Sequence, residues 1–558
     1  MMTKRCLVTV LVLTTSVLAL SPVGTTPLAQ AAPPEHRVYM VTDSVGLGAK
    51  NAVPAAFPAD WQVTVDGTPA LFVEQLESKH VRTQMAANPG VFGDYAIVAG
   101  GYNYPFWDPA RFDRSIDSII SAFEQAGVKY IFWVTLREVK PQYITAGAWT
   151  QVQPYYWYFP AVNEHLRAAL ARHPNLSLID WAAIADRPGL TYDAIHLNTF
   201  GASEYAGNIA RVVMSAASRV KAGSTTTVKV AGSGGVPTDA TAVSLNLTVT
   251  NPRTPGFLTA YPCDQERPST SNANFTSDNT VAAAAIVPVA ADGTVCVYTS
   301  ADTHLIVDVM GSFEGSDGYV RAGPTRLTDT RDLGNAGFVA HNPLRVQLPT
   351  FLAGDAAILN VTVVAGGQAG FVAVYRCGDP VPATSNVNFA PGGVVPNLVV
   401  AEADATGGVC LFANQPTHLV VDLFGGLTAG AVSLQAPVRA VDTRMAGGEP
   451  AAGSIVTAPT GVPRGTTGVL VNVTTTQPTT SGFLTAFACD AGRPPTSNLN
   501  VVPQQTVANF ATVKPDAAGN VCVFTNPSAQ VIVDVMGTIG PAFAGLAVPL
   551  RAFDSRAV

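Results

Sequence analysis

Hydrophobic and polar positions change their pattern near residue 222, which divides the chain into two regions. Before that point, short apolar runs typical of buried strands alternate with segments whose apolar residues recur every three or four positions, as on one helix face. The predicted strands cover 37–42, 62–65, 94–99, 128–136 and 176–179. The predicted helices cover 110–126, 161–172 and 202–219. This alternation predicts a parallel sheet with helices on both faces, an α/β fold.

Beyond residue 222 the chain repeats itself three times. The sequence "NLTVTNPRTPGFLTAYPC", which ends at Cys263, returns as "NVTVVAGGQAGFVAVYRC" and as "NVTTTQPTTSGFLTAFAC", which end at Cys377 and Cys489. A period of 112–114 residues suits a small domain rather than a solenoid unit. Within each copy, short alternating runs of Val, Thr and Phe lie between Gly, Pro and Asn, which predicts all-β domains, either sandwiches or barrels.

These patterns predict five segments. They are a signal peptide (1–31), an α/β domain (32–222) and three β repeats (223–333, 334–446 and 447–558). A "DTR" motif at Asp329 and Asp442 returns as "DSR" at Asp554, just before the last residue. We expect the strand that carries this last motif to complete the third copy.

The N-terminus has the three parts of an export signal. Lys4 and Arg5 are basic, residues 6–20 are mostly apolar, and Ala29-Gln30-Ala31 is a small-residue cleavage site. A membrane anchor is the alternative, but polar residues interrupt the apolar run, which is shorter than the roughly 20 residues needed to span a bilayer. We expect cleavage near Ala32 and a secreted protein, free or associated with the cell wall, without a membrane span.

Six cysteines follow the export signal, in three pairs whose members are 33 residues apart. Such even spacing in an exported chain predicts three disulfides. The pairs are Cys263 with Cys296, Cys377 with Cys410, and Cys489 with Cys522. A metal site is the alternative, but the chain has no CxxC motif and no neighbouring His cluster, so we expect no metal. Charged residues make up 13% and no basic stripe occurs, which argues against nucleic-acid binding.

Three motifs at predicted strand or helix ends carry candidate chemistry. Thr42-Asp43-Ser44 follows the first strand, where open α/β sheets place their ligands. Near the end of the domain, Asp193 precedes His196 by three residues, so it could orient the imidazole that takes a proton from Ser44. Asn103 follows the strand 94–99 and could donate its amide to an oxyanion. No G-x-S-x-G motif occurs, which argues against an α/β-hydrolase.

An early D-S, a middle G-x-N and a late D-x-x-H, in this order, resemble the SGNH (GDSL-like) hydrolase superfamily over residues 36–220. The resemblance implies a flavodoxin-like three-layer fold and hydrolysis or transfer of acyl esters without a cofactor. It also implies that Ser44 is the nucleophile, His196 the base and Asp193 its partner.

The same resemblance implies donors for the oxyanion. They are the backbone N–H of Ser44 and the side chain of Asn103, with Gly67 as the candidate for a further backbone donor. The chain departs from the family pattern at Thr42, where Gly is usual, and at Tyr104, where Asp is usual.

Aromatic residues are concentrated in the segment 142–159. We expect a loop that forms a wall or lid over the acyl or sugar part of a substrate, and packing onto the domain is the alternative. Tyr102 and Trp157 are the candidate substrate contacts. Arg137 precedes this segment, and we expect it on the surface beside an acid, with an anionic substrate group as the alternative partner.

Polar residues also recur in the repeats. Asp308, Asp422 and Asp534 end apolar strands, and two Asn residues recur in each copy (Asn272 and Asn274, Asn386 and Asn388, Asn498 and Asn500). We expect hydrogen bonds within turns, with a calcium or sugar site as the alternative. The repeats resemble one found in exported proteins of high-GC Gram-positive bacteria whose function is unassigned. Envelope attachment or glycan binding is the partner hypothesis for them.

Three functions follow from these observations. The first is an extracellular esterase that removes O-acyl groups from an envelope glycan, glycolipid or lipid. The second is an acyltransferase that moves the acyl group to a sugar hydroxyl, which a dry, aromatic-lined site would favour. The third is a binding protein whose first domain is inactive.

Overall fold

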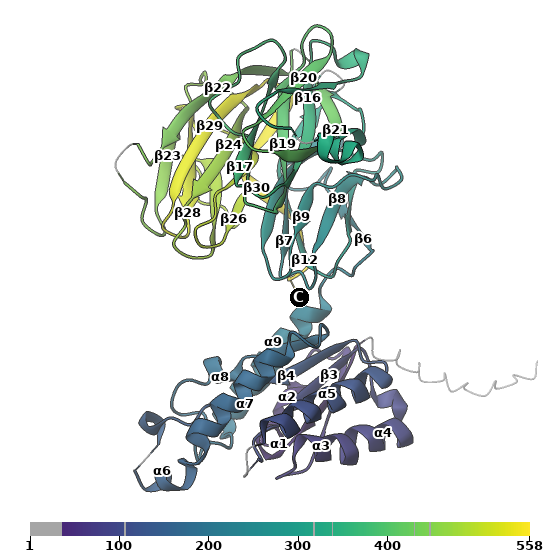
Figure 1. Cartoon of the computed structure of the whole chain (residues 1–558), viewed down its shortest axis with the longest axis vertical. Helices are drawn as coiled ribbons and strands as arrows, with labels where there is room; N and C mark the ends of the chain where they lie inside the picture. Colours follow the sequence, from purple (N-terminus) through teal and green to yellow (C-terminus); the bar gives the residue numbers. More distant parts are fainter. Residues whose placement is uncertain are drawn as a thin grey trace, which may run out of the picture. The chain divides into compact units, whose positions relative to one another are not determined.

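The computed structural model describes residues 36–104, 108–144, 146–315, 318–337, 339–428, 430–445 and 448–557. The predicted signal peptide lies outside these residues. The chain forms two compact units, one up to Ala210 and one from Arg211 onward, which are treated separately below (Figure 1). None of the described helices combines the length and the apolar character needed to cross a bilayer.

The first unit is built on a sheet of five parallel strands in the order β2-β1-β3-β4-β5. The strands are β1 (His36–Thr42), β2 (Trp61–Gly67), β3 (Tyr95–Ala99), β4 (Tyr130–Val134) and β5 (Leu176–Ile179). Every residue of β3 and β4 is buried, and because successive side chains point to opposite faces, both faces of the sheet are covered. The α/β prediction is confirmed, and the strand order is that of a flavodoxin-like doubly wound sheet.

Short and long helices connect these strands. They are α1 (Ser44–Leu47), α2 (Ala52–Ala55), α3 (Val73–Leu76), η1 (Glu77–Val81), α4 (Arg82–Ala87), η2 (Pro89–Val91), α5 (Pro109–Gln125), η3 (Pro141–Tyr143), α6 (Ala146–Val152), α7 (Tyr155–Ala169), α8 (Trp181–Ile184) and α9 (Thr199–Ala217). Helix α5 is well specified by sequence, since Asp108 caps its first turn, Pro109 opens it and Gly127 follows its end with a positive φ of 84°.

The aromatic segment is helical, which corrects the prediction of a loop. Helix α7 begins at Tyr155, ahead of the predicted start at 161. Phe159, Val162 and Leu166 are buried, and this spacing of three and four residues forms one helix face. This helical spacing could not be recognised in the sequence, because aromatic residues also occupy the positions next to the buried ones.

In the second unit, each copy contributes two antiparallel sheets that share one apolar core. The first copy contains β7 (Ala240–Thr250), β10 (Val281–Pro288) and β12 (His304–Glu314), with β6 (Thr225–Lys229), β8 (Gly256–Pro262), β9 (Ala273–Phe275) and β11 (Thr294–Thr299). The second contains β16 (Ala356–Ala365), β19 (Val394–Glu402) and β21 (Thr417–Leu427), with β15 (Leu344–Gln347), β17 (Gly370–Arg376), β18 (Val387–Phe389) and β20 (Gly408–Ala413). The third contains β24 (Gly468–Thr476), β27 (Val507–Val513) and β29 (Gln530–Ile539), with β23 (Ile455–Pro459), β25 (Gly482–Ala488), β26 (Leu499–Val501) and β28 (Asn520–Thr525).

The three copies are not separate domains. The outer faces of one sheet from each copy meet in a shared apolar cluster that includes Ile286, Phe424 and Phe510. The copies therefore surround a common centre in a propeller-like arrangement, which corrects the prediction of three self-contained sandwiches or barrels. The all-β prediction holds for the three copies.

Each copy also receives an edge strand from another copy. Strand β14 (Thr325–Asp329) pairs with β21 of the second copy, as does the short β13 (Tyr319–Val320). Strand β22 (Val432–Asp442) pairs with β29 of the third copy. Strand β30 (Phe543–Asp554) pairs with β12 of the first copy, so the ring closes.

This exchange corrects two predictions. The last strand does not complete the third copy, and the boundaries at 333 and 446 fall after strands that belong to the following copy. The short helices η4 (Thr330–Gly337) and η5 (Thr350–Leu352) follow β14. A sequence repeat cannot reveal the exchange, because three similar copies offer three similar edges.

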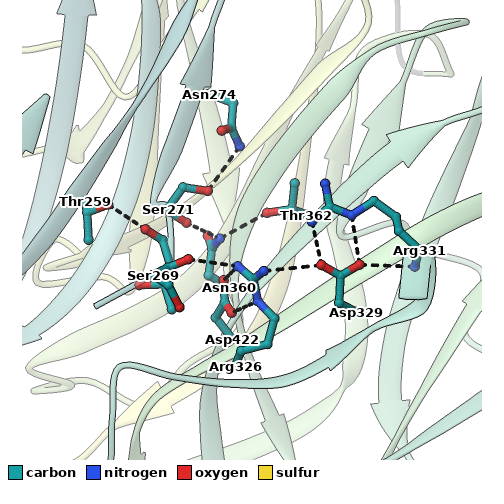
Figure 2. Close-up of polar contacts among 11 residues, drawn as sticks. Thr259, Ser269, Ser271, Asn274, Arg326, Asp329, Arg331, Asn360, Thr362 and Asp422 are labelled. Atoms are coloured by element: carbon teal, nitrogen blue, oxygen red, sulfur yellow. Dashed lines mark hydrogen bonds and ion pairs between the residues drawn. The ribbon is translucent and has the colours of Figure 1, made fainter. Parts of the chain in front are cut away.

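Ion pairs between partly exposed arginines and buried aspartates hold each exchanged strand. Figure 2 shows one of them, in which Arg326 reaches Asp422 while Asp329 contacts Arg331. The Arg Nε to Asp Oδ1 distances are 2.7 Å for Arg326 with Asp422, 2.9 Å for Arg439 with Asp534 and 2.9 Å for Arg551 with Asp308. The recurring aspartates are therefore partners of arginine, which disfavours the calcium alternative.

Buried asparagines form the second set of contacts between copies. The Nδ2 atoms of Asn246, Asn360 and Asn472 donate to the backbone oxygens of Ser497, Ser271 and Ser385. Each bond joins one copy to the copy before it, and the bond from Asn246 closes the cycle. Each of these asparagines begins an Asn-x-Thr sequence, the pattern of an N-glycosylation site. All three are almost fully buried, so the structure gives a glycan no access to them.

The three predicted disulfides are confirmed. Each joins the cysteine that directly follows β8, β17 or β25 to the cysteine within β11, β20 or β28.

Candidate active site

Ser44 is the first residue of α1, in the tight turn that follows β1, at the point where the order of the strands reverses. The Asp43 carboxylate caps this turn and accepts a hydrogen bond from the N–H of Val45 at 3.1 Å. Thr42 is fully buried and its hydroxyl donates to the backbone oxygen of Ala99 at 2.8 Å. Gly46 makes room for Thr42, because a Cβ at position 46 would lie 2.0 Å from the Thr42 hydroxyl oxygen. Thr42 is thus compatible with the tight turn.

The structure brings Ser44, His196 and Asp193 together from distant parts of the chain. His196 Nε2 lies 3.0 Å from Ser44 Oγ, and His196 Nδ1 lies 2.6 Å from Asp193 Oδ2. The other carboxylate oxygen of Asp193 accepts hydrogen bonds from the backbone N–H groups of Ile195 and His196. Burial raises the pKa of Asp193, but its bonds to the His196 ring and to these N–H groups outweigh burial and hold the pKa below its ordinary value.

The loop that carries Asp193 and His196 is closed on itself. Thr191 pairs with Leu197 as in an antiparallel sheet, and the N–H of Tyr192 donates to the backbone oxygen of His196. Ala194 has a positive φ of 74°, a conformation that costs free energy for a residue with a side chain. Contacts from outside the loop are therefore needed to hold its shape.

Arg137 supplies such contacts, which corrects its predicted place on the surface. The side chain is buried, and its guanidinium donates to the backbone oxygens of Ala185, Arg187 and Ala194 at 2.9, 2.8 and 3.0 Å. Ala194 lies between the two catalytic candidates. A guanidinium with five N–H donors in a fixed fork can satisfy several carbonyls at once, so Arg137 braces the loop.

We expect Arg137→Met to loosen this loop and to leave buried carbonyls without donors. The free energy of unfolding should fall by about 2–4 kcal/mol, and kcat for a small ester should fall roughly 100-fold because His196 is no longer held in place. Urea unfolding and steady-state kinetics measure the two effects. Arg114→Met, at an exposed position of α5, is the control and should change neither.

The predicted oxyanion donor Asn103 lies beside the turn but is already hydrogen-bonded. Its Nδ2 donates to Asp43 Oδ2 at 3.2 Å and to the backbone oxygen of Leu71 at 3.3 Å. Burial raises the pKa of Asp43 to about 7, and bonds from Val45 and Tyr102 oppose this rise. Asp43 therefore fixes the position of the Asn103 amide, a role that the sequence did not reveal.

Tyr104 stabilises the loop that carries Asn103. Its hydroxyl accepts a hydrogen bond from the N–H of Val73 and donates to Glu74 Oε2 at 2.9 Å. Tyr104 thus anchors this loop through its hydroxyl, although the family pattern has Asp at this position.

Gly67, the third predicted oxyanion donor, is the last residue of β2 and pairs with Thr42. The loop that follows β2 reaches Asn103 through Leu71, and its residue Ala70 has a positive φ of 59°. This loop could not be predicted from the sequence, because neither Ala70 nor Leu71 belongs to a recognisable catalytic motif.

The two predicted substrate contacts differ in exposure. Tyr102 is 7% exposed, and its hydroxyl accepts a hydrogen bond from the backbone N–H of Arg137, so it packs beneath the site. Trp157 on α7 is 57% exposed. Tyr192, which the sequence analysis did not single out, is 72% exposed and stacks on the His196 ring with centroids 5.8 Å apart.

Among the comparisons with known proteins, the one with solved structures finds similar chains. No family model matches the chain, and none of the curated proteins matches its sequence. Solved structures of SGNH and GDSL-type hydrolases are similar to about a third of it. The catalytic domain of Streptococcus pneumoniae peptidoglycan O-acetyltransferase A is 18% identical, with 31% of this chain and 90% of that chain covered and a TM-score of 0.25. A lipase/acylhydrolase from Enterococcus faecalis is 16% identical, with 32% and 95% covered and a TM-score of 0.26. A member of the lipolytic G-D-S-L family from Veillonella parvula is 14% identical, with 32% and 97% covered and a TM-score of 0.26.

Proposed function

We propose that the first unit is a serine esterase that hydrolyses O-acyl esters. The observation that carries this proposal is the continuous hydrogen-bonded chain from Ser44 through His196 to Asp193. In such a chain the imidazole takes the proton of the hydroxyl as it attacks the ester carbonyl, and the carboxylate stabilises the imidazolium that forms. His196 then returns the proton to the leaving alcohol, and water repeats the sequence on the acyl enzyme.

Donors for the oxyanion are available near Ser44. Its own backbone N–H is at the start of α1, where such groups have no partner inside the helix. The Asn103 amide can exchange its bond to the Leu71 oxygen for a bond to the oxyanion while Asp43 keeps hold of its other hydrogen.

The exposure of the site favours hydrolysis over acyl transfer. The side chains of His196 and Asp193 are 33% and 42% exposed, so water can reach the acyl enzyme. Transfer to a sugar would require a site that excludes this competing water.

We infer that the substrate is an acylated glycan, glycolipid or lipid of the cell envelope. The exposed ring of Tyr192 beside His196 offers an apolar face for the sugar or acyl group. The three disulfides of the second unit are consistent with a protein that works outside the cytoplasm.

A fluorophosphonate probe tests whether Ser44 is a nucleophile. We expect the full chain to be labelled at Ser44, Ser44→Ala to be unlabelled, and Ser78→Ala, a serine exposed on η1, to be labelled like the wild type. The probe reacts only with a serine that a base activates. Folded wild-type protein that stays unlabelled would instead support a binding protein with an inactive first unit.

A further inference from the structure

A large cavity lies where equivalent segments of the three copies meet. It has a volume of about 880 Å³, which is within the range of ligand-binding pockets. Strands β9, β18 and β26 each contribute to its wall, as do β10, β19 and β27 or the turns before them. The cavity therefore exists only in the closed ring, and no single copy could form it.

Most of the wall of this cavity is apolar, and its polar groups are uncharged. Among the described residues that line it, none is an Asp, Glu, Lys, Arg or His. Amide and hydroxyl side chains provide its polar groups, and the rings of Phe275, Phe371 and Phe389 provide apolar surface. Phosphate and other anions are bound mainly by Arg and Lys, so this composition disfavours an anionic ligand.

One of the amides recurs at the same position of every copy. Asn274, Asn388 and Asn500 all line the cavity and are partly exposed. Asn274 and Asn388 each use one donor on the neighbouring serine, Ser271 or Ser385, and Figure 2 shows the first of these bonds. An asparagine has two N–H donors and a carbonyl acceptor, so each retains hydrogen-bonding capacity for a ligand.

The cavity continues between the second and third copies. A second hollow of about 260 Å³ shares Phe371, Asn388 and Thr506 with it. It extends to Arg444 and to the ion pair of Arg439 with Asp534. A ligand held in the central cavity can thus extend outward along this groove, which suits a chain of linked units.

We propose that the ring binds a neutral oligosaccharide in the central cavity, with the sugar chain leaving through this groove. Sugar hydroxyls both donate and accept hydrogen bonds, and amide and Thr side chains can meet both needs. The apolar faces of sugar rings can pack on the Phe rings. A proline-rich peptide is the competing ligand, but it carries few polar groups to satisfy the recurring amides. The site is independent of the ester chemistry and would hold the protein on a glycan.

Binding of a labelled full-length Ser44→Ala protein to an array of short neutral oligosaccharides tests the proposal. This variant keeps any acyl groups on the sugars in place, so the measurement does not depend on the proposed esterase. We expect binding to glucose-, mannose-, galactose-, arabinose- or N-acetylglucosamine-based oligosaccharides. Titration calorimetry with the best of these should then give one site per chain.

Two variants locate the site. Val394 lies on the cavity wall and is 47% exposed, so Val394→Trp should fill the cavity and abolish binding. Val438 is 52% exposed and does not line the cavity, so Val438→Trp should bind as the unmodified ring does. Asn388→Ala should weaken binding about tenfold, which is the effect of one lost hydrogen bond.

Thermal unfolding must first show that each variant is folded. Absence of any bound oligosaccharide would overturn the proposal, and so would oligosaccharide binding that Val394→Trp leaves intact. The array should also carry a proline-rich peptide. If the protein bound this peptide and none of the sugars, and if Val394→Trp abolished that binding, the cavity would be assigned to peptide recognition instead.

Discussion

Replacing His196 with alanine is expected to lower kcat/KM for a short-chain p-nitrophenyl ester by roughly 10³–10⁴-fold, because Ser44 then has no base within reach. His196 Nε2 lies 3.0 Å from the Ser44 hydroxyl. The loss should appear mainly in kcat, since the imidazole acts on the proton that moves in the transition state. Steady-state kinetics over a range of substrate concentrations separates kcat from KM.

His173 provides a matched control in the same unit. Its Nε2 lies 2.7 Å from an Asp117 carboxylate oxygen, so it forms a His–Asp pair as His196 does, but without a serine. His173→Ala should keep kcat/KM within about twofold of the wild type, because a partly exposed pair contributes little to the fold. Equal losses in the two variants would show that general destabilisation, rather than a missing base, explains the effect. An unaffected His196→Ala would remove the basis of the esterase proposal.

The candidate site was largely predictable because its parts lie where chemistry and chain order agree. Ser44 and Asn103 follow two strands that are neighbours in the sheet, and Asp193 and His196 share one short loop. A Ser, an Asp and a His in this chain order, each near a predicted strand or helix end, are typical of a catalytic triad. The strands of the first unit were predicted well because buried strands such as Tyr130–Val134 have a continuous apolar pattern.

The supporting residues were not predictable in this way. Arg137 is a buried charge whose partners are backbone oxygens, and backbone oxygens leave no trace in the sequence. The burial of Asp43 depends on how the turn packs against Tyr102 and Asn103, which only the folded chain shows. Helices α3, η1 and α4 follow one another through residues 73–87, and their short, interrupted apolar pattern gave no signal.

Closure of the ring could not be predicted from the sequence for a different reason. The sequence shows three equal copies and three equal "DTR"-like motifs, and each strand that carries such a motif fits the edge of any copy. Only the folded chain shows that each strand pairs with the next copy in the cycle, and that the last strand pairs with the first copy. The consequence is a strong dependence of the whole second unit on its final residues.

Deletion of residues 541–558 is expected to prevent the second unit from folding cooperatively. The deletion removes β30, so β12 becomes an exposed edge with unpaired backbone groups. It also removes Phe543 from the central apolar cluster and leaves Asp308 buried without Arg551. Calorimetry should show that the unfolding transition of the second unit is lost or much broadened. Ester hydrolysis by the first unit should persist, because Ser44, His196 and Asp193 all lie within it.

A single substitution tests whether the stability of the second unit depends on closure of the ring rather than on the length of the chain. Arg551→Met keeps β30 but leaves the carboxylate of Asp308, which is 1% exposed, without its partner, and should cost about 3–5 kcal/mol of unfolding free energy. Arg321→Met breaks an ion pair with Asp264 in which both side chains are about 40% exposed, and should cost less than about 1 kcal/mol. Removal of Ala557 and Val558 alone should have no effect, because β30 ends at Asp554. If the chain without 541–558 unfolded at the same temperature as the full chain, the first copy would be stable without its exchanged strand and the closed ring would not hold the unit together.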